Sequence, residues 1–147
     1  SGRPACAPFR VEAEASCDAA WSTARRSRGS VSWAGSRTSS RDQIGGHFVG
    51  STMAHWQAGA QGRGVLFAGD AIFPKPDGMV TFMRSYPNMI PLSAAVVRRL
   101  AAHASRYDFD TLFNNFGSSV GPGAADIVRR LAERYAAWVS GENDHLT

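Results

Sequence analysis

Long apolar runs are missing from this sequence. No stretch approaches the roughly 20 apolar residues that a membrane-spanning helix needs, and no basic start followed by an apolar segment and a cleavage site is present. These absences predict a soluble, cytoplasmic protein with no membrane partner. Cysteine is scarce as well: Cys6 and Cys17 form no CxxC pair and have no histidine at zinc-finger spacing. The pattern favours two free thiols, with one small disulfide loop as the alternative.

The first 43 residues also lack leucine, isoleucine, methionine, tyrosine, lysine and histidine. Serine, arginine, alanine and glycine dominate, and the apolar residues follow neither helical nor strand periodicity. A segment with so few large apolar side chains adds little to a core, so an irregular or disordered basic arm is predicted. The same composition resembles a GC-rich coding region translated out of frame. Two interpretations therefore stand for residues 1–43, a native arm and a frame-disrupted segment.

The net charge of +4 belongs largely to this arm, which holds seven arginines against four acids, while the remaining chain holds nine basic residues against eight acids. The arm has neither the lysine clusters nor the interleaved aromatic residues of a dedicated nucleic-acid-binding protein. Nucleic acid is therefore not expected as a partner. Contact of the arm with an anion or a nucleic acid is the weakest of three functional hypotheses.

From Ile44 onward the sequence has the pattern of a globular domain, and a chain of 147 residues suits one domain with its own core. Residues 51–56 (STMAHW) alternate as a strand does, and residues 65–70 (VLFAGD) form a short apolar run that ends in glycine and aspartate. The glycine-rich AGAQGRG between them is typical of a turn. We predict two adjacent strands joined by a tight connection.

Two amphipathic helices follow, with a strand between them. Ser93 suits the N-cap of a helix that runs to about Tyr107, residues 111–113 favour a strand, and a second helix is predicted over residues 123–139. The apolar faces of the two helices comprise Val96, Val97, Leu100, Ala101, Ala104, Ala124, Ile127, Val128, Leu131, Tyr135 and Trp138. The order strand, strand, helix, strand, helix indicates an α/β layered domain over residues 44–140, with a tail over residues 141–147.

His47 and Asp70 are the residues that most suggest chemistry. His47 follows two glycines in GGHFVGS, and Asp70 ends the apolar run after the next strand. Both are placed at strand ends, where α/β folds commonly bind ligands. An imidazole and a carboxylate suit zinc, manganese or iron, and a carboxylate can bridge two metal ions. On spacing alone, a turn-capping histidine and aspartate are the alternative.

Taken together, GGHFVGSTMAHW and GRGVLFAGDAIF resemble the third and fourth metal-binding motifs of the metallo-β-lactamase-fold hydrolases. In that superfamily a Gly-His-x-x-Gly-Ser turn and a strand-terminal Gly-Asp occur in this order and at this separation. The stretch from Phe82 to Phe113 also looks like the C-terminal half of uncharacterised bacterial members. The resemblance covers residues 45–139, about two thirds of the chain.

The resemblance implies a sandwich of two β-sheets with helices on its outer faces and a metal site at one edge. His47 would bind one metal ion and Asp70 would be shared between two; zinc is the expected metal, with manganese and iron as alternatives. The family reaction is hydrolysis of a small-molecule substrate, in which a metal-bound hydroxide attacks a carbonyl or phosphoryl centre. Tyr86 and Asn88, in the loop after the Asp70 strand, are candidates to line the substrate pocket, with proline-bracketed packing as the alternative.

Parts of the family pattern are absent. The His-x-His-x-Asp-His motif is missing because no histidine precedes His47, and Asn114 and Asn115 stand where the last metal-binding histidine of the family would fall. We therefore predict a partial αββα sandwich, the C-terminal half of the fold, with an incomplete metal site and impaired or absent activity. Whether the chain is an enzyme stays open. The alternative is a non-catalytic interaction module, whose exposed sheet edge and face favour a homodimer or another partner.

Other titratable residues are predicted to be structural. His55 alternates with its neighbours on a strand, His103 lies on the polar side of a helix, and His145 lies in the tail. Asp108 and Asp110 look like a carboxylate pair but fit a helix-to-strand turn.

Overall fold

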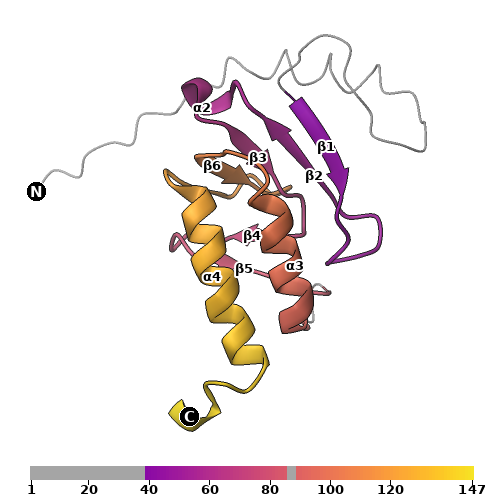
Figure 1. Cartoon of the computed structure of the whole chain (residues 1–147), viewed down its shortest axis with the longest axis vertical. Coiled ribbons are helices and arrows are strands. Elements are labelled where there is room, and N and C mark those ends of the chain that lie inside the picture. Colours follow the sequence, from indigo (N-terminus) through magenta and orange to yellow (C-terminus); the bar gives the residue numbers. More distant parts are fainter. Residues whose placement is uncertain (1–38, 86–88) are drawn as a thin grey trace, which may run out of the picture. The chain divides into compact units, whose positions relative to one another are not determined.

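The computed structural model describes residues 39–85 and 89–147, which form a mixed α/β structure (Figure 1). Its elements are β1 (Ser39–Gln43), β2 (Thr52–Trp56), α2 (Gly59–Gly62), β3 (Val65–Phe67), β4 (Phe73–Pro74), β5 (Val80–Thr81), α3 (Ala94–Ala104), β6 (Thr111–Phe113), β7 (Ser119–Val120), α4 (Ala124–Val139) and a 3₁₀ turn (Asp144–Leu146). None of the described helices is long and apolar enough to cross a membrane. The predictions for Cys6, Cys17 and the arm before Ser39 lie outside the described residues.

Five strands form one sheet in the order β1-β2-β3-β6-β7, and β4 pairs with β5 in a separate two-stranded sheet. Within the large sheet, neighbouring strands are antiparallel except for β3 and β6, which are parallel. A parallel pair needs a crossover connection, and here the crossover contains α3. The predicted pair of adjacent strands is confirmed as β2 and β3. They are joined through α2, a single turn in which Ala60 and Gln61 have left-handed φ angles of 50° and 59°.

Strand β1 corrects the prediction of irregular chain over residues 1–43 at the last five of those residues. Its sequence, SSRDQ, contains no apolar residue, so no alternating pattern marks it. The strand forms because its backbone pairs with β2 over its whole length, from Ser39 opposite Trp56 to Gln43 opposite Thr52. The sheet therefore extends to the N-terminal side of Ile44.

Helices α3 and α4 pack against each other over one face of the large sheet (Figure 1). The sheet contributes Met53, Leu66 and Leu112 to this core, each at most 1% exposed. The buried helix residues are Val97, Leu100, Ala101, Ala104, Ala124, Val128, Leu131, Ala132 and Ala136. Both predicted helices and most of their apolar faces are confirmed. Trp138 was predicted wrongly: it is 38% exposed, because it lies in the last turn of α4, which extends past the sheet (Figure 1).

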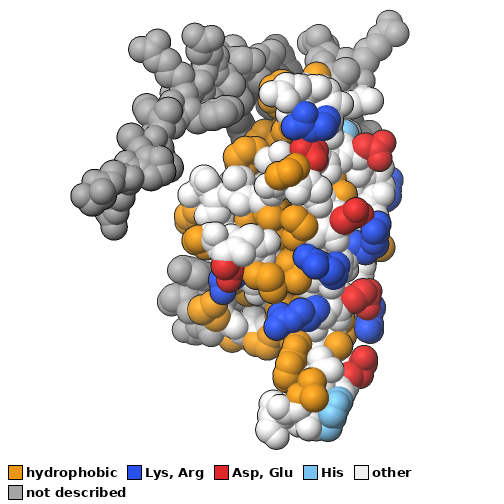
Figure 2. Space-filling model, turned by 90° about the vertical axis from the view of Figure 1, so that its left-hand side faces the viewer, with side chains coloured by type: hydrophobic (Ala, Val, Ile, Leu, Met, Phe, Trp, Pro, Cys, Tyr) orange, Lys and Arg blue, Asp and Glu red, His pale blue; other side chains and the backbone are white. Residues whose placement is uncertain are grey.

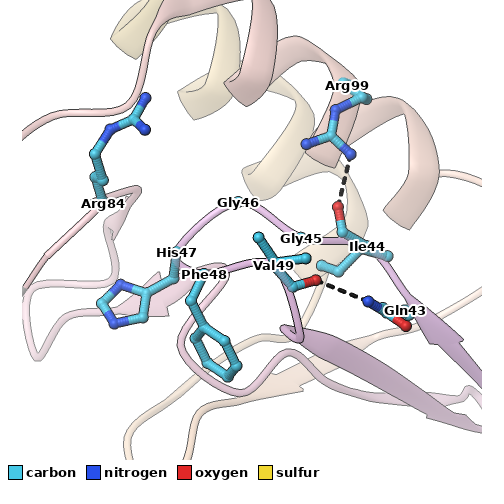
Figure 3. A pocket seen from close by; sticks show the side chains of 9 residues that line it. All are labelled: Gln43, Ile44, Gly45, Gly46, His47, Phe48, Val49, Arg84 and Arg99. Carbon is cyan, nitrogen blue, oxygen red and sulfur yellow. Dashed lines mark hydrogen bonds between the residues drawn. The ribbon is translucent and has the colours of Figure 1, made fainter.

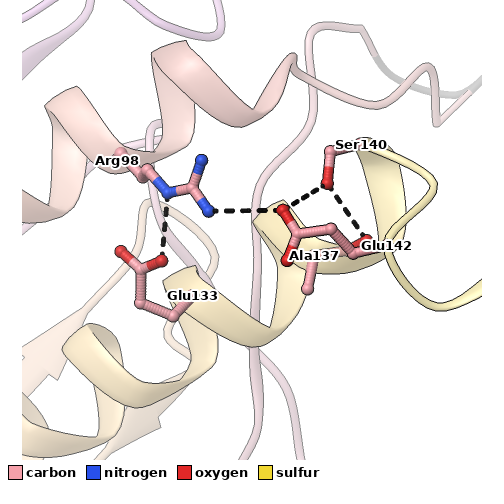
Figure 4. A network of polar contacts seen from close by, with 5 residues as sticks. All are labelled: Arg98, Glu133, Ala137, Ser140 and Glu142. Atoms are coloured by element: carbon pink, nitrogen blue, oxygen red, sulfur yellow. Dashed lines mark hydrogen bonds and ion pairs between the residues drawn. The ribbon is translucent and has the colours of Figure 1, made fainter.

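A polar network joins the outer surfaces of the two helices (Figure 4). The Nε of Arg98 on α3 donates to the Oε2 of Glu133 on α4 at 3.0 Å, and its Nη2 lies 3.9 Å from the Oε1 of Glu142. The hydroxyl of Ser140 donates to the same Glu142 oxygen at 2.9 Å. These side chains are largely exposed, so the network orders the end of α4 but contributes little to stability compared with the buried core.

The face of the sheet opposite the helices is partly uncovered within the described residues. Side chains alternate along a strand, so Phe67 and Phe113 share this face, where their rings stack with centroids 5.9 Å apart. Phe67 is 40% exposed and Trp56 is 43% exposed. Figure 2 shows charged side chains along one side of the molecule and hydrophobic side chains reaching the surface beside them. Among the described residues, one face of the sheet is thus packed against the helices, and the other leaves Phe67 and Trp56 partly exposed.

Candidate metal centre

The loop that carries His47 is closed by Ser51, which is 4% exposed. The backbone N–H groups of Ile44 and Gly45 both donate to the carbonyl oxygen of Ser51, at 2.8 and 3.1 Å. The Ser51 hydroxyl accepts a hydrogen bond from the N–H of Phe48 at 3.1 Å. The serine of GGHFVGS therefore acts as the internal brace of the loop, and it satisfies polar groups that would otherwise be buried without partners.

Gly46 explains why glycine precedes the histidine. Its φ is +98°, a conformation that L side chains rarely adopt. A Cβ at this position would lie 2.8 Å from Cδ1 of Leu100, a fully buried residue of α3. The loop can therefore pass closely over α3 only where no side chain is present. Arg99 of the same helix fixes the loop from the other side, because its Nη1 donates to the carbonyl oxygen of Ile44 at 2.6 Å (Figure 3).

The imidazole of His47 is oriented by the backbone of Met83. Its Nδ1 lies 3.0 Å from the Met83 carbonyl oxygen, and since a carbonyl oxygen can only accept, Nδ1 carries the proton. The neutral ring then has its lone pair on Nε2. Histidines that bind metal ions are typically held in this way, with one nitrogen donating to a carbonyl and the other free for the ion.

Asp70 lies in the turn after β3. This turn is tied to the sheet by the N–H of Ala68, which donates to the carbonyl oxygen of Phe113 at 2.9 Å, and it is closed by the N–H of Ala71, which donates to Ala68 at 3.0 Å. One carboxylate oxygen of Asp70, Oδ1, is buried and has no hydrogen-bond partner among the described residues. A buried carboxylate oxygen without a partner is energetically costly. It therefore suggests that a ligand completes its surroundings.

His47 and Asp70 line the same cavity, of about 60 Å³. Its other walls are Phe73, Met83 and Phe116, and the Phe73 and Phe116 rings lie with centroids 5.7 Å apart. A volume of this size accommodates an ion with one or two water molecules. The structure thus brings together the two residues for which the sequence predicted metal binding, in apolar surroundings that strengthen electrostatic interactions.

The donors fit one part of a metal site and do not complete it. Within residues 39–85 and 89–147, no group of three histidine, cysteine, aspartate or glutamate side chains is placed to hold an ion. Catalytic zinc sites ordinarily use three protein ligands. His47 and Asp70 have suitable donor atoms, and a centre with three side-chain ligands of these types would need a further one from outside these ranges.

Asn114, which stands where the family histidine would fall, has a structural role. Its Oδ1 accepts hydrogen bonds from the N–H groups of Phe116 and Ser118, both at 2.9 Å, and so builds the turn after β6. Asn115 is exposed. The substrate-pocket candidates Tyr86 and Asn88 lie outside the described residues.

The histidines predicted to be structural have such contacts. His55 lies 2.8 Å from the carbonyl oxygen of Asp108 through its Nε2 and stacks on Tyr107. In the tail, Nδ1 of His145 lies 3.1 Å from the carbonyl oxygen of Glu142. His103 contacts Asp42, with Nε2 and Oδ2 3.1 Å apart.

Asp110 is the turn residue that its sequence context predicts. Its Oδ1 accepts from the N–H of Gly123 at the start of α4, and its Oδ2 accepts from Nε of Arg63, both at 2.9 Å. The amide of Gly123 and, after it, the guanidinium of Arg63 lower the pKa of this carboxyl. These contacts fix the approach to α4.

A second polar cluster was not predicted from the sequence. Asp42 on β1 accepts hydrogen bonds from His103, in the last turn of α3, and from the hydroxyl of Tyr107, in the turn that follows the helix. The bond from Tyr107 is the main cause that lowers the pKa of Asp42, and His103 and Arg106 add to it. Burial, together with the bond to Asp42, raises the pKa of Tyr107. The four-residue spacing of His103 and Tyr107 could have indicated that the two side chains share a partner. That partner, Asp42, lay in a segment predicted to be irregular.

Comparison with known proteins gives one relative of unestablished role. No family model matches the chain. Over 104 residues the chain is 40% identical to the uncharacterized protein YmaE of Bacillus subtilis (strain 168). The match covers 70% of this chain and 38% of YmaE, so the chain spans less than half the length of that relative.

Proposed function

We propose that residues 44–140 are the C-terminal half of a metallo-β-lactamase-like αββα sandwich and that they contribute His47 and Asp70 to a divalent metal centre. The observation that carries this proposal is that one cavity is lined both by His47, whose Nδ1 is held by the Met83 carbonyl oxygen, and by Asp70, whose buried Oδ1 has no hydrogen-bond partner among the described residues. The helices on one sheet face and the open apolar opposite face are compatible with half of such a sandwich.

Zinc suits these donors best, with manganese or iron as alternatives, because one imidazole and one carboxylate are acceptable to all three. When bound, such an ion supplies Lewis-acid activation for hydrolysis of a carbonyl or phosphoryl substrate. The residues of this chain have supporting roles. The Met83 carbonyl holds the imidazole, and Phe73 and Phe116 form apolar walls of the cavity.

With two donors, the described residues bind a metal ion weakly, and we propose that the chain by itself is impaired or inactive as a hydrolase. The missing ligands would come from sequence outside the described residues. YmaE has sequence beyond the aligned part, because the match covers 38% of its length. A complete relative would then carry the activity on a small-molecule substrate.

The test is the zinc affinity of the full chain, measured by isothermal titration calorimetry. We expect weak binding, and we expect His47→Ala and Asp70→Ala each to lower the affinity by about tenfold or more, since even changes to residues that support metal ligands cost 10–100-fold. The matched control is His145→Ala, which removes an exposed histidine from the tail and should leave the affinity unchanged.

Absence of zinc, manganese and iron binding would refute the proposal. So would binding that His47→Ala and Asp70→Ala leave intact, because the ion would then be held elsewhere.

A second candidate function, a non-catalytic interaction module, is favoured by the open sheet face. Phe67 and Trp56 are exposed by 40% and 43% on this face, and Phe116 beside the cavity is 69% exposed. An apolar surface of this kind commonly marks an interface. The partner would be a second copy of the chain or a protein that supplies the missing half of the sandwich.

A further inference from the structure

A second, larger hollow lies beside the candidate metal centre. It has a volume of about 580 Å³ and is lined by residues 43–49 together with Arg84 and Arg99. Small-molecule sites commonly occupy about 300–1,000 Å³. His47 lines both this hollow and the small cavity that contains Asp70. A molecule held in the hollow would therefore lie next to the candidate metal ligand.

The hollow is positively charged. Arg84 and Arg99 lie on either side of Gly46 (Figure 3), and none of the lining residues is an aspartate or glutamate. Among the ion pairs within the described ranges, none involves Arg84 or Arg99. Two guanidinium groups without a carboxylate partner are suited to an anion, because their planar N–H groups match the oxygens of carboxylates and phosphates.

Each arginine is held in place by a hydrogen bond to a backbone carbonyl oxygen. Arg99 projects from α3 and uses Nη1 to hold the Ile44 carbonyl oxygen at 2.6 Å, which leaves other N–H groups of its five for a ligand. The backbone N–H of Arg84 donates to the carbonyl oxygen of Ile90 at 2.7 Å. Its neighbour Met83 holds the His47 ring. The same short segment thus positions the imidazole and one of the two guanidinium groups.

The loop backbone adds two further donors. The N–H groups of Gly46 and His47 have no acceptor within the described part of the chain, and both residues line the hollow. Successive backbone N–H groups around residues of positive φ are a recurring element of anion sites, and Gly45 and Gly46 have φ of +65° and +98°.

We propose that this hollow binds the anionic group of a small molecule, a carboxylate or a phosphate, through Arg84 and Arg99. That the molecule is a substrate presented to His47 and Asp70 rests on the proposed function; the anion binding itself does not. The substrate class of a complete relative would accordingly be anionic, anchored by this group at a distance from the bond that is broken.

The test is calorimetric titration of the full chain after metal removal with EDTA and dialysis, at low ionic strength so that screening is weak. Inorganic phosphate is the ligand in one series and malonate in the other. We expect at least one anion to bind, and we expect Arg84→Gln to lower its affinity by about tenfold, as for loss of a charge-assisted hydrogen bond. The tighter of the two anions identifies the group.

The matched control is Arg130→Gln, which removes the same charge from an exposed position on α4 and should leave the affinity within about twofold. Arg99→Gln should also weaken binding, but it removes the bond to Ile44 as well. The side chain of Arg84 is exposed and forms no ion pair within the described residues, so Arg84→Gln carries the test if Arg99→Gln does not fold.

Three outcomes would overturn the inference: no binding of either anion, binding that Arg84→Gln leaves unchanged, and equal weakening by Arg84→Gln and Arg130→Gln. The protein is metal-free in this titration. Loss of zinc binding in His47→Ala therefore tests the metal centre, and loss of phosphate or malonate binding in Arg84→Gln tests the anion site independently. Either property can fail while the other is retained.

Discussion

Gly46 is the residue on which the position of His47 depends most directly. It combines a φ of +98° with a close approach to the buried side chain of Leu100. Gly62 also has a positive φ, +84°, but a Cβ there would meet no atom within 4 Å. Alanine substitutions at the two positions therefore separate the cost of backbone strain from the cost of steric overlap.

We expect Gly46→Ala to lower the free energy of unfolding by about 2–5 kcal/mol, because a side chain with positive φ costs roughly 1–2 kcal/mol and overpacking adds about 1–3. Gly62→Ala should cost only the strain, about 1–2 kcal/mol. Urea denaturation of the two variants measures the difference. Equal losses in both would show that Leu100 moves aside without cost and that the contact does not position the loop.

At the residue scale, the sequence identified the candidate ligands but not what supports them. His47 and Asp70 were predicted because their chemical types and flanking glycines form motifs. The Met83 carbonyl was not predicted, because every residue has a backbone carbonyl and its position depends on the fold. Arg84 and Arg99 were also missed, since isolated arginines in a sequence look the same whether they face solvent or line a hollow.

At the scale of elements, Asp42 joins the edge strand β1 to the end of α3. It accepts hydrogen bonds from Tyr107 and His103, and β1 has no apolar residue to add core contacts. Polar contacts therefore hold β1 in place, whereas buried side chains hold the other strands. A contact of this kind makes the docking of the strand depend on pH.

The pKa of Asp42 in the folded protein is lowered from 3.8 by the bond from Tyr107, then by His103 and Arg106. Its contribution to stability is therefore present above about pH 4 and is lost as pH falls through the lower, folded pKa. We expect Tyr107→Phe to cost about 1 kcal/mol at pH 7 and less at pH 3, measured as unfolding free energy in urea. The raised pKa of Tyr107 has the opposite consequence: its contribution is lost as pH rises above 10.

The control for this prediction is Tyr135→Phe. The Tyr135 hydroxyl accepts a hydrogen bond from the N–H of Leu92 at 3.0 Å and has no hydrogen bond to a carboxylate among the described residues, so its removal should cost the same at pH 7 and pH 3. If the cost of Tyr107→Phe is also the same at pH 7 and pH 3, the ionisation of Asp42 does not contribute to the stability of the folded protein.

The helices and strands were predictable where apolar residues recur at a regular spacing. The helices α3 and α4 and the strand at Thr111–Phe113 follow from apolar periodicity, which reports directly on the buried face. Strand β1 has no such pattern, because its register comes from backbone pairing with β2. A polar edge strand carries almost no signal of its own in a single sequence.

At the scale of the whole molecule, the open sheet face is the feature that most invites association. The stacked rings of Phe67 and Phe113 and the exposed Trp56 lie on it. The sequence predicted an exposed face from the missing half of the pattern, but the residues that form it could be named only once strand register was known.

If this face is an interface between two copies, sedimentation velocity should show a fraction of dimer that increases with protein concentration. Phe67→Thr keeps the strand preference but removes the ring, and it should shift the population toward monomer. Leu146→Thr, which alters a 64% exposed residue of the tail, should not. A monomer at every concentration tested would rule out self-association, and an equal shift in both variants would place the contact elsewhere.

The parallel pairing of β3 with β6 also bears on the order in which the cavity forms during folding. His47 and Asp70 flank strands that are neighbours in the sequence as well as in the sheet, whereas Phe116 follows β6, which reaches β3 only after α3 has been traversed. Contacts between distant parts of a chain form more slowly than local ones. During folding, His47 and Asp70 would therefore come together first, and Phe116, which completes the wall of their cavity, would arrive last.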